Sequence, residues 1–175
     1  LVQWGLDMLT EAQMSSGDPT TNPAVGLGLL MAAGALNGRD KLTLIVPPAL
    51  EAFGLWVEQL VAESTGKQGV GVVPIAGEVL SDPSSYGADR VFVRLRVTGG
   101  ADETARDAEV AALAAAPKLT LDFEEPAALG AEFIRWEVAT AVAGALLNVN
   151  PFDEPNVQTA KDATNVLLAR HRSDG

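Results

Sequence analysis

The chain has 175 residues, of which 47% are hydrophobic and 20% charged; this fits one globular domain with an aliphatic core and argues against disorder. Twelve basic and twenty-three acidic residues give a net charge of −11, so neither nucleic acid nor an anionic membrane surface is an expected partner. There is no cysteine and one histidine, His171, near the end of the chain; this excludes disulfides and thiol nucleophiles and disfavours metal sites and a Ser-His-Asp triad.

The predicted elements alternate between helices and strands. In chain order, we expect helices at 4–14, 23–37, 49–65, 105–116, 126–147 and 153–170, and strands at 42–46, 70–74, 90–97 and 118–123. This alternation predicts an α/β fold, a three-layer sandwich with an open parallel β-sheet. The strand at 90–97 alternates apolar and polar residues, so one of its faces is predicted to be wet or to line a cleft.

Residues 15–23 are rich in turn-forming residues and indicate a loop. We therefore expect an N-terminal helix and linker at 1–22, followed by a domain at 23–175. The longest apolar run, 25–36, is too short to span a membrane, and no basic-then-apolar leader is present, so we expect a cytoplasmic protein. Because the sequence begins at Leu1 rather than methionine, we expect a piece of a longer protein.

The sequence contains partial matches to two nucleotide-binding motifs, and neither match is complete. Gly66-Lys67 follows a predicted helix rather than a strand and lacks the first glycine and the hydroxyl residue of a phosphate-binding P-loop. Gly26-Leu27-Gly28 lacks the third glycine of the dinucleotide fingerprint and follows a loop. Nucleotide binding is therefore not expected.

Glu63 is the first candidate for proton transfer. It falls in the last turn of a predicted helix that Gly66 ends, where the negative end of the helix dipole disfavours a charged carboxylate. A glutamate in that position is readier to take up a proton, as a general base must be. We expect Glu63 to lie close to where the carboxyl edge of the sheet opens, because ligands of open α/β sheets bind at that edge. From the residues alone, a surface glutamate near Lys67 is the more economical interpretation.

Lys161 is the second candidate. Asp153 is a plausible N-cap for the last helix, and helical spacing then aligns Val157, Lys161, Thr164 and Leu168 on one face. A lysine within such an inward-facing stripe must reach a cleft or an anionic partner, because burying an unpaired ammonium is costly. We expect Lys161 to be partly buried and to reach the same cleft as Glu63, which would join the segments around these two residues into one site. The alternative is a lysine whose charged tip extends from the edge of the core into water.

Two segments carry a family resemblance. Glu-Ser-Thr-Gly-Lys at 63–67, with the glycines and proline that follow it, and Asn-Pro-Phe-Asp at 150–153, with Val157 and Lys161, resemble motifs of the glucose-6-phosphate isomerases. The resemblance covers about 22–168 and is to the carboxy-terminal sugar isomerase (SIS) domain. Segments 38–44 and 130–137 resemble in particular the isomerase half of the transaldolase/glucose-6-phosphate isomerase fusions.

The resemblance implies a flavodoxin-like SIS fold and the interconversion of glucose 6-phosphate and fructose 6-phosphate through an enediolate, with no cofactor or metal. It assigns proton transfer to Glu63, whose surrounding segment matches the family better. Glu78, in a Gly-Glu segment like that of the animal-type enzymes, is the alternative base. It assigns ring opening and the binding of anionic oxygens to Lys161, and substrate binding to Ser64 and Thr65.

The resemblance also implies partners outside the chain. A preceding SIS domain would supply the phosphate-binding loop and an arginine, so this segment alone is expected to be nearly inactive; a homodimer is a further possible assembly. The sequence departs from the family motif at Glu154, Asn156 and Gln158, and no histidine matches the catalytic one. A sugar-phosphate sensor without turnover, or a dimerisation module, therefore remains as an alternative function.

Overall fold

Each helix and strand that the sequence predicts is present in the computed structural model, which describes residues 1–14, 18–98, 103–153 and 155–174. The helices are α1 (Val2–Met14), α2 (Pro23–Leu36), α3 (Glu51–Thr65), α4 (Glu103–Ala112), α5 (Leu129–Leu147) and α6 (Pro155–Asp174), with short 3-10 turns η1 (Pro48–Leu50), η2 (Pro83–Ser85) and η3 (Pro126–Ala128). The strands are β1 (Lys41–Ile45), β2 (Val73–Ile75), β3 (Arg90–Val97) and β4 (Lys118–Phe123).

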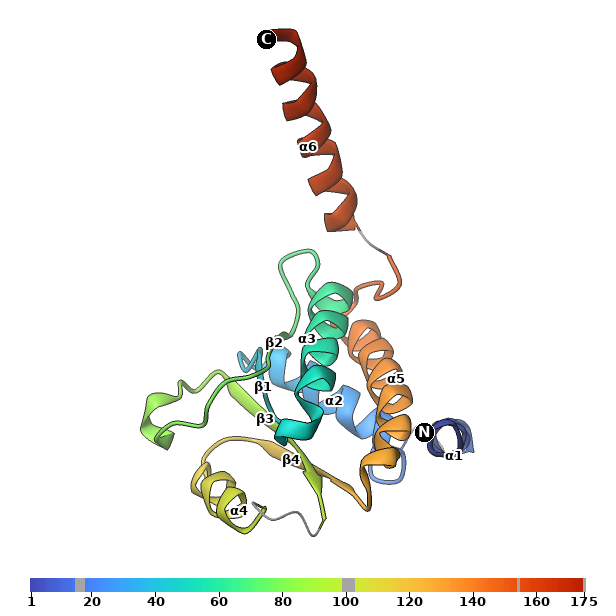
Figure 1. Ribbon diagram of the computed structural model, residues 1–175, viewed down its shortest axis with the longest axis vertical. Coiled ribbons are helices and arrows are strands. Elements are labelled where there is room, and N and C mark those ends of the chain that lie inside the picture. The colour runs from blue at the N-terminus through green and yellow to red at the C-terminus, as the bar shows by residue number, and fades with distance from the viewer. Residues whose placement is uncertain (15–17, 99–102, 154, 175) are drawn as a thin grey trace.

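The four strands form one parallel sheet in the order β2-β1-β3-β4 (Figure 1). The crossover through α3 leads from β1 to β2 at one edge of the sheet, and the crossover through α4 leads from β3 to β4 at the other edge. Because crossovers between parallel strands are right-handed, these opposite directions place α3 and α4 on opposite faces. The predicted α/β class with helices on both faces of a parallel sheet is thereby confirmed.

The two faces of the sheet carry cores of very different size. Helices α2, α3 and α5 cover one face, where Trp136 of α5 is fully buried among side chains of β1, β3 and β4. The other face is covered by α4 and holds a small cluster of Ile45, Phe92, Val110 and Leu113. The connection from β2 to β3 contains only η2 and no α-helix. The sheet is therefore thinly covered on the α4 side, beside this connection.

Strand β2 begins three residues later than the sequence predicts. The apolar run that starts at Val70 first makes a turn, with an isolated bridge between Lys67 and Val70. Gly69 and Gly71 have positive φ angles of 80° and 152°, which residues with a side chain rarely adopt. The chain turns at these positions before it enters the strand. Pairing with β1 starts at Val73, and Pro74 lies in the middle of this short edge strand.

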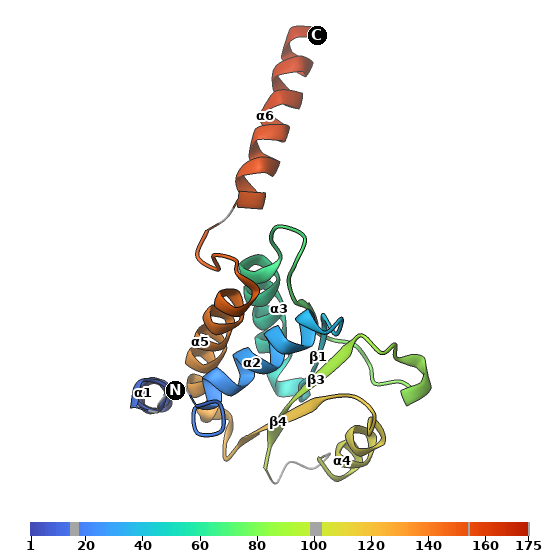
Figure 2. The same ribbon diagram turned by 180° about the vertical axis from the view of Figure 1, so that it is seen from behind.

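Helix α6 projects away from the rest of the chain (Figures 1 and 2). Its described side chains, from Thr159 to Arg172, are all exposed. The expectation that Lys161 is partly buried on an inward-facing stripe is therefore wrong for this structure, because no described element covers that face. Residue 154, one of the motif departures, lies outside the described residues. None of the described helices is long and apolar enough to cross a membrane.

Candidate functional site

Glu63 lies in the last turn of α3, as predicted, but at the opposite edge of the sheet from the one expected. Helix α3 begins after the carboxyl end of β1 and ends before the amino end of β2, so it runs back along the parallel strands. The Glu63 side chain is exposed, and its Oε1 accepts a hydrogen bond of 3.2 Å from Gln59 Nε2. The expectation that Glu63 lies where the carboxyl edge opens is wrong.

The hydroxyl group of Thr65 is already engaged by the backbone. Thr65 is fully buried; its Oγ1 donates to Val61 O at 2.8 Å and accepts from Val72 N at 2.9 Å. These bonds fasten the end of α3 to the segment that leads into β2. The structure therefore gives Thr65 a packing role, while the half-buried Ser64 lies beside it at the amino edge.

Lys67 joins the two segments that carry the family resemblance. Its side chain is only 4% exposed, and its Nζ donates to Asn150 O at 2.6 Å, to Asp153 Oδ1 at 2.6 Å and to the backbone oxygen of Asp153. An ammonium group has three protons to donate, so this set satisfies it completely. The segments at 63–67 and 150–153 thus meet as expected, but through Lys67 rather than Lys161.

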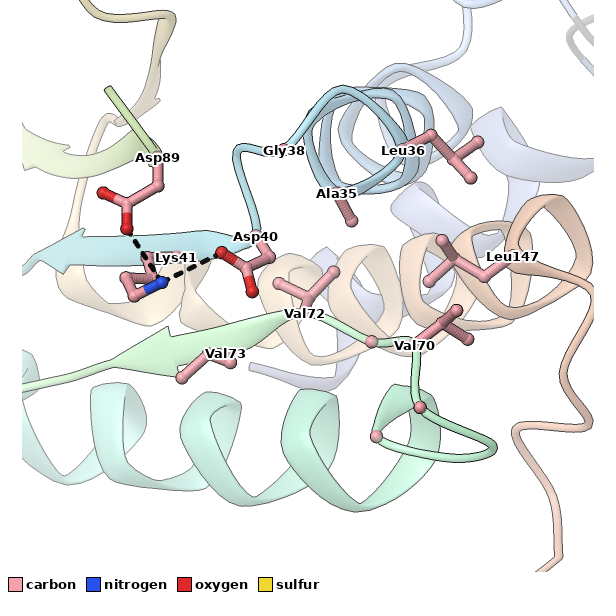
Figure 3. A pocket seen from close by; sticks show the side chains of 13 residues that line it. Ala35, Leu36, Gly38, Asp40, Lys41, Val70, Val72, Val73, Asp89 and Leu147 are labelled. Carbon is pink, nitrogen blue, oxygen red and sulfur yellow. Dashed lines mark hydrogen bonds and ion pairs between the residues drawn. The ribbon is translucent and has the colours of Figure 1, made fainter. Parts of the chain in front are cut away.

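A cavity of about 580 Å³ lies at the amino edge of the sheet (Figure 3). Glycines and aliphatic side chains of α2 and of 66–73 form most of its lining. Its cation is Lys41, whose Nζ lies 2.8 Å from Asp89 Oδ2 and 3.1 Å from Asp40 Oδ1. The bond to Asp89 raises the pKa of Lys41 and lowers that of Asp89. The ammonium group of Lys41 is thus held between two carboxylates, which leaves an excess of one negative charge at this cavity.

Glu78, the alternative base, is held by side chains from two central strands. It follows the carboxyl end of β2 by three residues. Arg90 Nη1 of β3 donates to Glu78 Oε2 at 2.7 Å and Nη2 donates to Oε1 at 3.2 Å, while Thr43 Oγ1 of β1 donates to Oε2 at 3.2 Å. The side chains of Glu78 and Arg90 are 28% and 17% exposed, and Thr43 is fully buried. A carboxylate in this setting is fixed in position and still open to solvent.

Two small cavities lie at the carboxyl edge of the sheet, and Glu78 lines one of them. One, of about 160 Å³, is lined by 44–46, Glu51 and 77–79; the other, of about 120 Å³, extends from 45–48 toward Arg94. Both are lined by Arg106. In open parallel sheets ligands bind outside the carboxyl ends of the strands, so these cavities lie where a substrate is expected.

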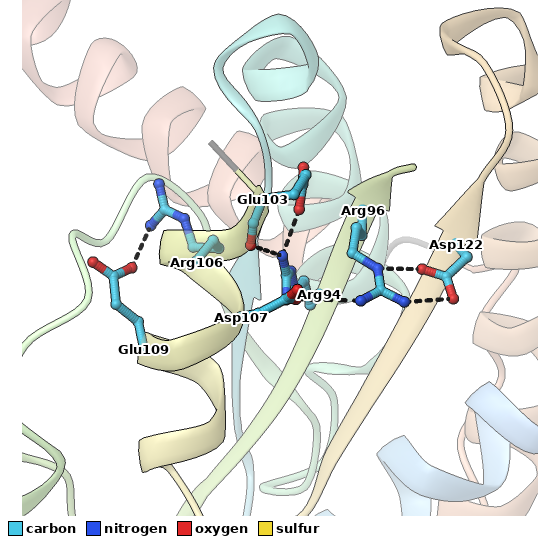
Figure 4. A network of polar contacts seen from close by, with 7 residues as sticks. All are labelled: Arg94, Arg96, Glu103, Arg106, Asp107, Glu109 and Asp122. Atoms are coloured by element: carbon cyan, nitrogen blue, oxygen red, sulfur yellow. Dashed lines mark hydrogen bonds and ion pairs between the residues drawn. The ribbon is translucent and has the colours of Figure 1, made fainter. Parts of the chain in front are cut away.

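The remaining arginines of β3 are neutralised by carboxylates (Figure 4). Arg94 is 3% exposed and forms ion pairs with Glu103 and Asp107 of α4. Arg96 Nε lies 2.6 Å from Asp122 Oδ1 on β4. Arg94 lowers the pKa of Asp107, which keeps that carboxylate charged. On the face of β3 that is predicted to be wet or to line a cleft, Arg94 is buried and lines a small cavity, so this part of the face is not wet. Its arginines attach α4 and β4.

Sequence reasoning missed Thr43, Lys67 and Arg90 as members of the site. The alternating pattern of β3 pointed to a polar face and could have singled out Arg90. Thr43 has no signal of its own, because its partner lies 35 positions away. Lys67 belongs to the motif at 63–67, but no local pattern predicts its bond to Asp153, 86 positions away. In the described part of the chain, no group of three or more acidic or histidine side chains is placed to hold a metal ion.

Comparison with curated proteins relates the chain to one enzyme family, although no protein-family profile matches it. It is 31% identical to a probable glucose-6-phosphate isomerase of Haloarcula marismortui, over 87% of this chain and 43% of that protein. It is 29% identical to the glucose-6-phosphate isomerase of Rubrobacter xylanophilus, over 85% of this chain and 44% of that protein. The chain therefore spans less than half the length of these relatives.

Solved structures show the same fold. A hypothetical protein of Thermus thermophilus matches 95% of this chain and 49% of its own, with a TM-score of 0.76 and 21% identity. A glucose-6-phosphate isomerase of Chlamydia trachomatis matches 97% of this chain and 42% of its own, with a TM-score of 0.77 and 14% identity. Over most of its length, the chain is related to glucose-6-phosphate isomerases and corresponds to part of such an enzyme.

Proposed function

We propose that this chain is the carboxy-terminal SIS domain of a glucose-6-phosphate isomerase and that Glu78 is its catalytic base. The observation that carries the assignment of the base is the position of Glu78 beside a small cavity at the carboxyl edge of the sheet. Sequence similarity to the curated isomerases over most of the chain supports the reaction.

In the proposed reaction, the carboxylate of Glu78 removes the proton bound to C2 of the open-chain aldose. The electron pair of that bond forms the C1–C2 double bond of an enediolate, and the proton on O2 passes to O1. Return of the first proton to C1 gives the ketose. Such a step requires a base held within hydrogen-bond reach of the carbon and cationic groups near the developing oxyanion.

Glu78 is favoured over Glu63 on geometric grounds. Glu63 lies at the amino edge, exposed and bonded to Gln59, whereas Glu78 is held by Thr43 and Arg90 next to a cavity. A fixed carboxylate can meet a bound substrate without first being ordered, which lowers the entropic part of the barrier. We therefore assign proton transfer to Glu78 and retain Lys161 as the residue that assists ring opening.

The proposed site is completed by parts of the protein outside this chain. Lys161 stands on α6, whose described side chains are all exposed, so its role requires α6 to pack against another part of the enzyme. We propose that a preceding SIS domain provides that surface and the grip on the phosphate group. The resemblance to the fusion branch extends this proposal to a transaldolase domain further upstream. The 175-residue segment alone is then expected to show almost no turnover.

Isomerase activity of the full-length protein tests this proposal, with glucose 6-phosphate as substrate. Glu78→Gln keeps the size of the side chain and removes its basicity, so kcat is expected to fall about 10²- to 10⁴-fold. Glu63→Gln is the matched control and should retain nearly full activity. The reverse pattern would assign proton transfer to Glu63. Binding of glucose 6-phosphate by a parent protein that shows no turnover would establish a sensor instead.

A further inference from the structure

A cavity of about 320 Å³, hereafter the α4 cavity, lies at the amino edge of the sheet, on the face that α4 covers. It lies between the connection from β2 to β3 and the end of α4. Several of the residues that line it are small, namely Gly87, Ala88, Ala112 and Ala115. Their side chains are too short to fill the space between the two segments, so a hollow remains where the sheet is thinly covered.

The base of the α4 cavity is aromatic and apolar. Phe92 and Leu113, which line it, are almost fully buried, and Tyr86 beside them is half-buried. The rings of Tyr86 and Phe92 pack edge-on, with centroids 5.2 Å apart. The Tyr86 hydroxyl accepts a hydrogen bond of 2.9 Å from Ser81 N, and the Arg90 guanidinium lies 5.3 Å from the centre of its ring. These contacts fix the Tyr86 ring, so the cavity offers a preformed surface on which a further ring can pack.

Arg39 supplies positive charge to the α4 cavity. It is half-buried, and its Nη1 donates to Ala88 O at 2.6 Å, which holds the guanidinium at the cavity. Among the described residues, Arg39 has no carboxylate partner, and Nε and Nη2 have no hydrogen-bond acceptor. None of the described residues that line the cavity is acidic, and the neighbouring Asp89 is paired with Lys41 at 2.8 Å. A guanidinium has five N–H donors in a rigid fork, so Arg39 can still bind a carboxylate through two of them.

The end of α4 does not cancel this positive charge. Helix α4 ends at Ala112, and the carboxyl end of a helix carries a partial negative charge that disfavours a nearby anion. Lys118 Nζ donates to Leu113 O at 3.0 Å, so an ammonium group offsets this partial charge. The lining of the α4 cavity is therefore positively charged, in a chain whose net charge is −11.

We propose that the α4 cavity binds a small ligand that has one aromatic ring and one carboxylate group. The ring packs against Tyr86 with Phe92 beneath it, and the carboxylate accepts two hydrogen bonds from Arg39. The cavity volume is at the lower end of the range for ligand sites, about 300–1,000 Å³, so a single ring fits better than a nucleotide. A sugar phosphate is excluded as the ligand because its many hydroxyl groups would meet an apolar lining. This site does not depend on which residue transfers protons in the proposed reaction.

Saturation-transfer NMR on the full-length protein tests the proposal, with phenylacetate as the probe. We expect saturation of its ring protons and a dissociation constant of about 1 mM or below, which is usual for a ligand of this size. Benzyl alcohol keeps the ring without the carboxylate, and acetate keeps the carboxylate without the ring. Each should bind at least about tenfold more weakly than phenylacetate, because each loses one of the two sets of contacts. Benzyl alcohol that binds as tightly as phenylacetate would overturn the proposal.

Two substitutions locate the binding. Arg39→Gln removes the charge and should weaken phenylacetate binding about tenfold or more, while benzyl alcohol binding stays unchanged. Ala115→Phe places a large side chain in the cavity and should abolish the binding of both compounds; Ala115 is exposed, so this change is compatible with folding. Arg170→Gln, the same change on the exposed helix α6, is the matched control and should bind phenylacetate as the parent does.

The proposal is overturned if the parent protein shows no saturation transfer to phenylacetate at about 10 mM, roughly ten times the expected dissociation constant. It is also overturned if Arg39→Gln or Ala115→Phe binds phenylacetate as the parent does, because the compound would then bind elsewhere. Isomerase activity decides none of these outcomes, so they are independent of the proposed function.

Discussion

Lys67 and Asp153 form an ion pair of 2.6 Å across 86 positions of the chain. The lysine is buried, whereas the aspartate side chain is half exposed. Together with the bonds from Lys67 to the backbone oxygens of Asn150 and Asp153, this pair fixes the segment from which α6 departs. Lys67 thereby anchors the segment that precedes the helix carrying Lys161.

Lys67→Met should lower the free energy of unfolding by about 1–3 kcal/mol, because backbone acceptors lose their charged donor. Amide hydrogen exchange should accelerate at residues 149–161. Lys118→Met is a matched control, since Lys118 also donates to a backbone oxygen but is exposed. Unchanged exchange in this segment of the Lys67 variant would show that the segment is held by other contacts.

Lys161→Met tests whether α6 contributes to the site. Because the Lys161 side chain is exposed on a helix that no described element covers, its loss should leave the thermal unfolding temperature unchanged. Turnover of the full-length enzyme should nevertheless fall by orders of magnitude, because the lysine is proposed to act on charge that develops during the reaction. Parent-like turnover would exclude Lys161 from the mechanism.

Glu132 on α5 makes stability depend on pH. Its side chain is 3% exposed, and burial raises its pKa above 4.5. Arg135, whose Nε lies 2.8 Å from Glu132 Oε1, opposes this shift. The folded state therefore binds this proton more tightly than the unfolded state, so the contribution of Glu132 to stability falls as pH rises from about 4.5 through the folded pKa.

Glu132→Gln removes this titration, so the stability of the variant relative to the parent should rise with pH over this interval. Urea unfolding of both proteins between pH 4 and pH 8 measures the difference, and the other carboxylates cancel in the comparison. A difference that stays constant across the range would contradict the assignment.

Gly28 allows α2 and α5 to approach closely. A Cβ atom at this position would lie 2.6 Å from Ala139 O and 2.7 Å from Val142 Cβ. We expect Gly28→Ala to destabilise the protein by about 1–3 kcal/mol through overpacking, despite the better helix propensity of alanine. Leu29→Ala, on the exposed side of the same helix, should change thermal unfolding much less. Equal stability of Gly28→Ala and the parent would mean that α5 can shift.

The sheet was predictable because its signals are local. Strands β3 and β4 occupy the predicted residues, since each is an apolar run bounded by polar residues or turns. β2 was predicted too early because Val70 and Val72 are as apolar as a strand requires, although they lie in a turn that Gly69 and Gly71 make possible through their positive φ angles. An apolar pattern alone does not distinguish a strand from a turn that contains glycines.

The candidate site was predictable only in part. It depends on the direction in which the helices run along the sheet and on contacts between residues that are far apart in the sequence. The alternation of helices and strands already implied that α3 ends at the amino edge, and this rule would have placed Glu63 there from the sequence. The contacts of Glu78 with Thr43 and Arg90 depend on strand order, which the residues do not specify. The structure leaves the Lys161 side chain exposed, so its surroundings give no indication of its role.

Pro74 lies in the middle of β2, at the edge of the sheet, where Val73 N donates to Asp40 O of the neighbouring chain segment. Because successive residues of a strand point their N–H groups to opposite sides, the missing N–H of Pro74 is on the outer side. A further strand, from this protein or another, would find no donor there. The short β2 therefore limits growth of the sheet and protects its open edge against aggregation.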